Sequence, residues 1–118
     1  MILVVDDDLS LLELAGKILN QDRQVFLASD AKQAFELAER LGFSVALVDL
    51  DLKGKAGLLL IQRLRVSFPD LAIIAISGTL SEHEVEAARN LGIVEVLHKP
   101  ITRDWKPVVE RVRAGKAR

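Results

Sequence analysis

The sequence predicts an α/β fold in which a doubly wound parallel sheet carries helices on both faces. Short apolar runs alternate five times with longer amphipathic stretches along the chain. The short runs are apolar at nearly every position, as expected of strands that are buried on both faces. The chain has 118 residues, half of them hydrophobic, so we expect residues 1–118 to form a single domain with one sizeable core.

Five short segments are predicted to be strands, and four of them lead directly into a charged or hydroxyl residue. The strands are expected at residues 2–5, 25–28, 45–48, 72–76 and 94–98. The polar residues that follow the first, third, fourth and fifth strands are Asp6, Asp49, Ser77 and Lys99. Functional groups are therefore expected at the carboxyl ends of the strands.

The stretches between the strands carry helical periodicity and helix-end signals. Helices are expected at residues 11–19, 31–41, 58–67, from 81 to near 92, and 104–113. Asp30 is a predicted N-cap with Gln33 three residues later, and Gly42 is expected to end that helix. Ser81 and Glu84 have the spacing of a capping box at the start of the fourth helix.

Right-handed crossovers leave few arrangements for such a sheet, and at this length the flavodoxin-like (βα)5 order 2-1-3-4-5 is the natural one. Ligands of open parallel sheets bind outside the carboxyl ends, at the point where the strand order reverses. That point lies between the first and third strands. Asp6, Asp7 and Asp49 should therefore converge there, with Ser77 and Lys99 approaching from neighbouring strands.

These five residue types suit phosphoryl transfer to a carboxylate. Clustered carboxylates repel one another unless a cation joins them, and hard oxygen ligands suit Mg²⁺. Asp49 stands at the centre of the group as the candidate nucleophile that forms an aspartyl-phosphate, and Asp6 and Asp7 are candidate metal anchors. Lys99 can neutralise phosphoryl charge, and the Ser77 hydroxyl can donate to a further oxygen.

Composition excludes several other classes of function. The formal net charge of −1 gives no basis for nucleic acid as a direct partner. The chain has no cysteine, which excludes disulfides, thiolate metal sites and thiol catalysis. The apolar runs are too short for membrane insertion, and the first residues do not resemble a signal peptide, so a cytoplasmic location is expected.

Four motifs in order resemble the receiver domain of two-component response regulators, over essentially the whole chain. Residues 2–8 look like the first strand and acidic pair of that family, and residues 73–78 look like its strand ending in a hydroxyl residue. Residues 48–52, with Gly57 following, resemble its phosphorylation segment. Residues 96–100 resemble its Lys-Pro ending.

The resemblance implies roles that agree with the chemistry. Asp49 would accept a phosphoryl group from a sensor histidine kinase, a phosphotransfer protein or a small phosphodonor. The Mg²⁺ ion would be held by Asp6, Asp7, Asp49 and the backbone carbonyl of Asp51.

In the same family pattern, Ser77 and Lys99 would bind the phosphoryl oxygens, and the peptide between Lys99 and Pro100 would be cis. The chain would then be a signalling switch or phosphorelay element that acts on an unknown downstream protein. It would not be a turnover enzyme, although it would catalyse its own phosphorylation and dephosphorylation.

Four positions depart from the family pattern. Lys53 replaces a common proline and is predicted to be a solvated loop residue. Asp51 faces the site where an apolar side chain is frequent, and its carboxylate would either repel the phosphoryl group or orient a water. Gly78 replaces a common alanine. Val96 replaces the usual Phe or Tyr, which predicts a muted switch or one that uses another surface.

Two other functions fit parts of the pattern. The chain could be a receiver fold used as a protein-interaction module, with weak or no phosphorylation-dependent switching. Asp49 and Asp51 also resemble the nucleophile motif of haloacid-dehalogenase-like phosphatases, in which Asp51 would be a general acid. That family carries the motif on its first strand, whereas here it follows the third predicted strand.

Several remaining polar and aromatic residues have structural interpretations. Asp8 is predicted to be a turn or cap residue, and His83 a solvated helix residue. His98 is predicted to be packed or capping. Trp105 is predicted to anchor the last helix.

Overall fold

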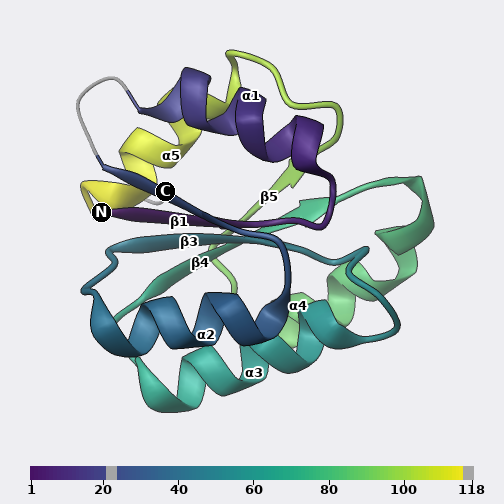
Figure 1. The fold of residues 1–118 in the computed structure, drawn as a ribbon. Coiled ribbons are helices and arrows are strands. Elements are labelled where there is room, and N and C mark those ends of the chain that lie inside the picture. The colour runs from purple at the N-terminus through teal and green to yellow at the C-terminus, as the bar shows by residue number, and fades with distance from the viewer. Residues whose placement is uncertain (21–23, 116–118) are drawn as a thin grey trace.

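The computed structural model describes residues 1–20 and 24–115, which form a five-stranded parallel sheet between two layers of helices (Figure 1). The strand order β2-β1-β3-β4-β5 is the predicted one. The strands are β1 (Ile2–Val5), β2 (Val25–Ala28), β3 (Val45–Asp49), β4 (Ala72–Ser77) and β5 (Glu95–His98). The doubly wound fold class is therefore confirmed.

The helices divide between the two faces of the sheet. In Figure 1, α1 (Leu9–Leu19) and α5 (Trp105–Arg113) lie above the sheet. The helices α2 (Ala31–Arg40), α3 (Ala56–Ser67) and α4 (Val85–Asn90) lie below it. A 3₁₀ helix, η1 (Thr79–Glu84), connects β4 to α4.

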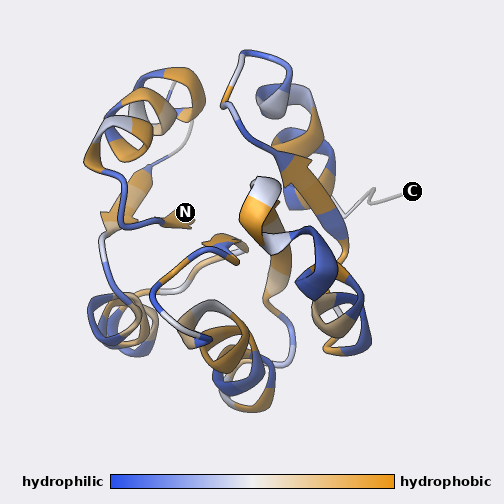
Figure 2. Ribbon diagram, turned by 90° about the vertical axis from the view of Figure 1, so that its right-hand side faces the viewer, coloured by the Kyte–Doolittle hydropathy of each residue, from blue (hydrophilic) through white to orange (hydrophobic). Residues whose placement is uncertain are grey.

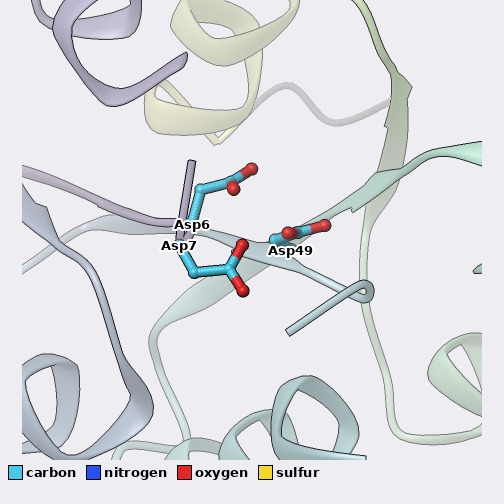
Figure 3. A group of neighbouring side chains, drawn as sticks. All are labelled: Asp6, Asp7 and Asp49. Atoms are coloured by element: carbon cyan, nitrogen blue, oxygen red, sulfur yellow. The ribbon is translucent and has the colours of Figure 1, made fainter. Parts of the chain in front are cut away.

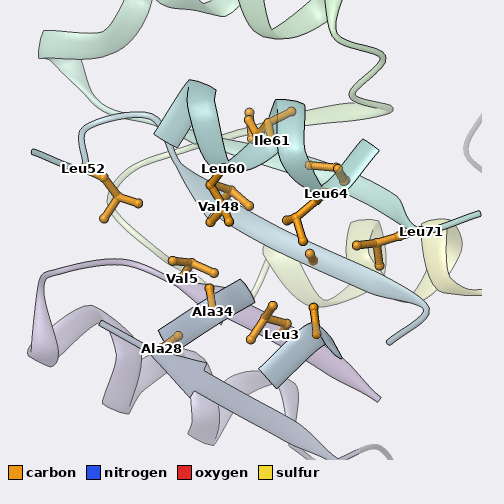
Figure 4. Close-up of a cluster of buried hydrophobic side chains, with 14 of the residues drawn as sticks. Leu3, Val5, Ala28, Ala34, Val48, Leu52, Leu60, Ile61, Leu64 and Leu71 are labelled. Atoms are coloured by element: carbon orange, nitrogen blue, oxygen red, sulfur yellow. The ribbon is translucent and has the colours of Figure 1, made fainter. Parts of the chain in front are cut away.

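Alternate residues of each central strand enter different cores, because successive side chains of a strand point to opposite faces. Leu3 and Val48 pack with residues of α2 and α3 such as Ala34, Leu60 and Leu64, several of which Figure 4 shows together. The neighbouring strand positions pack against α1 and α5 in a second cluster. Figure 2 shows the resulting pattern, in which the helices turn apolar surface towards the sheet. This double burial explains the continuous apolar strands of the sequence.

The register of the sheet brings the carboxyl ends of β1 and β3 side by side. Val5 pairs with Val48, so the residues that follow them, Asp6 and Asp49, are neighbours. Asp49 in turn pairs with Ile76, next to Ser77. The candidate site residues of three strands therefore meet at the carboxyl end of the sheet.

Helix ends follow local signals only in part. Asp30 caps α2 by accepting a hydrogen bond from the Gln33 backbone, as predicted, but the Gln33 side chain accepts from Ser29 rather than from Asp30. That helix ends at Arg40, before Gly42. α3 begins at Ala56, two residues earlier than expected.

The prediction for the fourth helix was wrong at its start. Ser81 is buried inside η1, where its hydroxyl accepts a hydrogen bond from the Gly78 backbone, and α4 begins only at Val85. Ser81 was expected to cap the start of an α-helix. It instead hydrogen-bonds within the turn that follows β4, next to the candidate site.

The remaining structural predictions have mixed outcomes. His83 is exposed and Trp105 is buried in the core under α5, as expected. His98 is exposed, so the prediction that it is packed was wrong. Lys53 is exposed in the loop after β3. Among the helices of residues 1–20 and 24–115, none combines the length and apolar character needed to cross a bilayer.

Candidate phosphoacceptor site

The first strand delivers two aspartates to the carboxyl end of the sheet. Asp6 is fully buried, and its Oδ1 accepts a hydrogen bond of 2.9 Å from the Asp8 backbone. Its Oδ2 is buried without a hydrogen-bond partner. Asp7 is exposed, and Asp8 caps α1 by accepting from the Ser10 and Leu11 backbones, as predicted. The turn after β1 thus leaves one buried and one exposed carboxylate beside β3.

The third strand ends at Asp49, whose side chain is also fully buried. Its Oδ1 accepts a hydrogen bond of 2.9 Å from the Asp51 backbone, which fixes the orientation of the carboxylate. Gly57, at the start of α3, lies so close that a Cβ there would collide with the Asp49 carbonyl oxygen. A glycine at this position therefore lets α3 start directly against the end of β3.

A single lysine joins the carboxylates from the other side of the site. Lys99 Nζ lies 3.3 Å from Asp49 Oδ2, 3.4 Å from Asp6 Oδ2 and 3.8 Å from Asp51 Oδ2. The Lys99 backbone N–H donates to the Ser77 carbonyl at 2.9 Å, which anchors the residue beside β4. The following peptide bond, to Pro100, is cis, as the resemblance implied.

Burial sets the protonation behaviour of these groups. Burial raises the pKa of Asp49 from 3.8 to about 7; the Asp51 backbone N–H and Lys99 lower it, and Asp6 raises it. Burial also raises the pKa of Asp6. Burial lowers the pKa of Lys99, but its attraction to Asp49 and Asp6 outweighs this, so that the pKa of Lys99 is raised overall. Burial therefore opposes the charged form of Asp6 and Asp49, and Lys99 favours it.

The donor set of the three aspartates fits a hard divalent cation. Asp6, Asp7 and Asp49 each offer an oxygen, and these oxygens lie within 4.8 Å of one another. Figure 3 shows the three carboxylates gathered at the ends of β1 and β3. Asp6 Oδ2 accepts no hydrogen bond, although Lys99 Nζ lies 3.4 Å away, and Asp7 is exposed; such a donor set suits an ion that keeps part of its water shell, as Mg²⁺ does.

Ser77 is buried at the end of β4, but its hydroxyl is engaged by neighbours rather than by the carboxylates. Ser77 Oγ lies 3.3 Å from both the Gly78 carbonyl oxygen and Ser81 Oγ. Sequence reasoning missed Ser81 as a member of this network, because its spacing to Glu84 matched a helix cap. The available signal was the spacing of four residues between Ser77 and Ser81 in a segment that must turn back over the site.

Comparison with known proteins agrees with this geometry. The model of the response regulator receiver domain family matches residues 2–107. The chain belongs to the response regulator receiver family. In this receiver domain the acidic motif begins at the end of β3, the third strand, and the acidic pair follows β1, so the haloacid-dehalogenase-like alternative has no support in the fold. A receiver domain is a signalling domain and not a turnover enzyme.

Two curated relatives are similar to this receiver domain over most of its length. It is 31% identical over 100 residues to a response regulator receiver protein of Anaeromyxobacter sp. (strain Fw109-5), with 84% of this chain and 42% of that protein covered. It is 30% identical over 115 residues to the hydrogenase transcriptional regulatory protein HoxA of Cupriavidus necator, with 95% of this chain and 23% of that protein covered. The chain thus spans less than half the length of these relatives.

Two crystal structures share the fold over nearly their whole length. A CheY-like receiver domain from Methanospirillum hungatei JF-1 has a TM-score of 0.90 at 25% identity, with 98% of this chain and 94% of that chain covered. The receiver domain of NtrX from Brucella abortus has a TM-score of 0.88 at 27% identity, with 97% and 98% covered. The strand order and the helix layers are therefore those of receiver domains.

Proposed function

We propose that this receiver domain accepts a phosphoryl group on Asp49 in the presence of Mg²⁺. The observation that carries the proposal is the arrangement around the Asp49 carboxylate. It is fully buried, has the Lys99 ammonium 3.3 Å from Oδ2, and offers an oxygen within 4.8 Å of oxygens of Asp6 and Asp7. A nucleophilic carboxylate between two sources of positive charge is the arrangement that phosphoryl transfer requires.

The reaction forms a bond between a carboxylate oxygen of Asp49 and phosphorus while the bond from phosphorus to the leaving group breaks. Lys99 binds a phosphoryl oxygen, and the Ser77 hydroxyl donates to another after leaving its present partners. When bound by Asp6, Asp7, Asp49 and the Asp51 backbone carbonyl, Mg²⁺ supplies charge neutralisation to the phosphoryl group.

The return reaction regenerates the site. A water molecule attacks phosphorus, the bond to the Asp49 oxygen breaks, and inorganic phosphate leaves. The same charged groups that assist phosphorylation assist this step. The domain would thus catalyse its own phosphorylation and dephosphorylation without turning over an external substrate.

The donors and partners follow from the same chemistry. We propose that the donor is a phosphohistidine of a sensor histidine kinase or phosphotransfer protein in the cytoplasm, which has imidazole as a good leaving group. The partner downstream is a protein that distinguishes the phosphorylated form. In this proposal residues 1–118 act as one receiver unit, whether alone or attached to an effector.

The test is intact-mass analysis after incubation with Mg²⁺ and acetyl phosphate or phosphoramidate. The wild type should gain one phosphoryl group, while Asp49→Asn and a Mg²⁺-free sample should gain none. Asp70→Asn is the matched control, because Asp70 is exposed at the opposite end of the sheet and its substitution should leave phosphorylation unchanged.

Two results would contradict the proposal. Phosphorylation of Asp49→Asn at the wild-type rate would move the acceptor to another residue. A folded wild type that gains no phosphoryl group and binds no fluoroberyllate would favour the protein-interaction module instead.

A further inference from the structure

Gly78 leaves a hollow beside the site that the Asp51 side chain fills. A Cβ built on Gly78 would lie 2.5 Å from Asp51 Oδ2, a distance that real Cβ atoms essentially never show. It would also lie 3.5 Å from Lys99 Cδ. The Asp51 carboxylate thus occupies volume that any other residue at position 78 would claim. The two departures from the usual family pattern, at positions 51 and 78, are in direct contact.

We call the position of the Asp51 carboxylate against Gly78 its seat. In this seat the carboxylate lies close to Lys99, the lysine that pairs with Asp49. Asp51 Oδ2 lies 3.8 Å from Lys99 Nζ, and the Asp51 side chain is 19% exposed, whereas Asp6 and Asp49 are fully buried. Asp51, Gly78 and Lys99 also line one open hollow. Lys99 therefore pairs with two buried carboxylates and lies near a third that is partly exposed.

We propose that the Asp51 carboxylate is an internal competitor for Lys99 that weakens the hold of the site on a phosphoryl group. Seated on Gly78, it pairs with the ammonium while Asp49 is unmodified, and it leaves the seat when a phosphoryl oxygen binds Lys99. This proposal rests on the proposed function of Asp49 and deepens it. Asp51 acts through Lys99 and is a positioning residue.

Charge favours the displacement. The carboxylates of Asp6, Asp49 and Asp51 already outnumber the single ammonium of Lys99. A phosphoryl group on Asp49 adds negative charge within reach of the same ammonium, and like charges at short range repel. Asp51 is the one of the three with access to solvent, so it can move away at a lower cost than Asp6 or Asp49. The pair between Asp51 and Lys99 must break each time a phosphoryl group or its analogue binds. The free energy needed to break it weakens the binding of that anion.

The first test compares fluoroberyllate binding with Mg²⁺ by titration calorimetry in the wild type, Asp51→Asn and Gly78→Ala. Asp51→Asn keeps the shape and removes the charge, so binding should tighten about threefold to tenfold, as expected for loss of a partly exposed charge pair. Gly78→Ala should tighten binding in the same direction, because its methyl group displaces the carboxylate from its seat. The double variant should bind no more tightly than the better single variant.

The matched control is Asp8→Asn. Asp8 lines the same hollow, and its cap on α1 survives in asparagine, but no ion pair joins it to Lys99. It reports the effect of removing one nearby negative charge without competition for the lysine. Asp51→Asn should exceed this control by at least about twofold, within the range of an exposed pair.

A second test needs neither metal nor phosphoryl analogue. Urea unfolding with a chelator is measured for the wild type, Asp51→Ala, Gly78→Ala and the double variant. Gly78→Ala should destabilise the wild type more than it destabilises Asp51→Ala, because in the latter the new methyl group meets no carboxylate. The backbone effect of replacing glycine is common to both comparisons and cancels.

The outcomes separate this proposal from the one on Asp49. Additive unfolding effects would overturn the seat on Gly78. Fluoroberyllate affinity equal in the wild type, Asp51→Asn and Asp8→Asn would overturn the competition and leave the proposed function of Asp49 standing. No binding by any folded variant would overturn the proposed function, and the competition with it.

Discussion

The two ends of the sheet are built from the same strands but bury different kinds of side chain. At the carboxyl end, Asp6, Asp49 and Ser77 are buried polar side chains. At the amino end, the loops after α2 and α3 gather Phe43 and Phe68 around a hollow that also includes Leu71. Buried charges are costly and buried apolar groups are favourable. The buried polar groups at the carboxyl end, where we propose the phosphoacceptor, therefore lower the stability of the fold, and the apolar groups at the amino end raise it.

Hydrogen bonding shows the same contrast. At the amino end the loop backbone is paired: the Ser44 N–H donates to Met1, and the Ala72 N–H donates to Ser44. The Arg65 guanidinium donates to the Leu71 carbonyl at 3.0 Å. At the carboxyl end Asp6 Oδ2 is left without a hydrogen bond. Unmet polar capacity thus lies where we propose the ligands bind.

The largest effect is expected from removing the cation of the site. Lys99→Met leaves Asp6 and Asp49 buried without their partner, so the free energy of unfolding should fall by about 3 to 5 kcal/mol at pH 8 in a chelator. The loss should shrink at pH 5, where the carboxylates can take up protons. Urea unfolding at both pH values measures this, with the exposed Lys32→Met as control. A loss below that of the control would remove the contrast between the two ends.

Removing the central carboxylate should have the opposite sign. Because the pKa of Asp49 is raised to about 7 in the folded protein, the folded state binds a proton more tightly than the unfolded state between pH 3.8 and about 7. Stability of the metal-free wild type should therefore fall as pH rises through that window, and Asp49→Asn should make this fall smaller, leaving the part due to Asp6, whose pKa is also raised. At pH 8 the variant should be more stable by about 2 to 4 kcal/mol.

Chelator and Mg²⁺ samples provide the check on this sign. Mg²⁺ should restore stability to the wild type at pH 8 and should have little effect on Asp49→Asn. If the free energy of unfolding of the wild type and of Asp49→Asn depends on pH in the same way, the buried Asp49 carboxylate does not destabilise the fold. For the carboxyl end of the sheet we therefore expect that Asp49→Asn is more stable than the wild type and is not phosphorylated.

The amino end should show the reverse combination. Leu71→Ala removes a buried side chain and should lower the free energy of unfolding by about 2 to 3 kcal/mol. Phosphorylation of the folded variant should remain at the wild-type rate, as measured by intact mass below its unfolding temperature. Val66→Ala, at an 80% exposed position, is the control and should change stability by less than about 0.5 kcal/mol. Slower phosphorylation in Leu71→Ala would mean that the ends are coupled.

The sequence predicted what depends on periodicity and on strand order. Apolar runs gave the strands, and the polar residues after them gave Asp6, Asp49 and Lys99, which the structure brings together. Contacts made by side chains from different elements were not predictable. The cap pattern at Ser81 is locally valid, yet burial under the turn after β4 decides its role. The seat of Asp51 on Gly78 likewise depends on distances that no local pattern encodes.

The smallest effect is expected in the response of the domain to phosphorylation. Val96 lies on β5 opposite Ala75 and is only partly buried, so it offers no large ring to move when Ser77 binds a phosphoryl oxygen. The Ser77 hydroxyl is already next to Ser81, and exchange of this partner requires only a local adjustment of η1.

Crystal structures with and without fluoroberyllate should therefore differ by less than about 1 Å in backbone position between residues 78 and 98. Val96→Phe supplies the missing ring and is the matched comparison, in which a larger displacement is expected if ring size limits the switch. A shift above about 2 Å in the wild type would show that another group transmits the signal. In that case Ser81 is the first residue to replace, because it is the buried contact between Ser77 and η1.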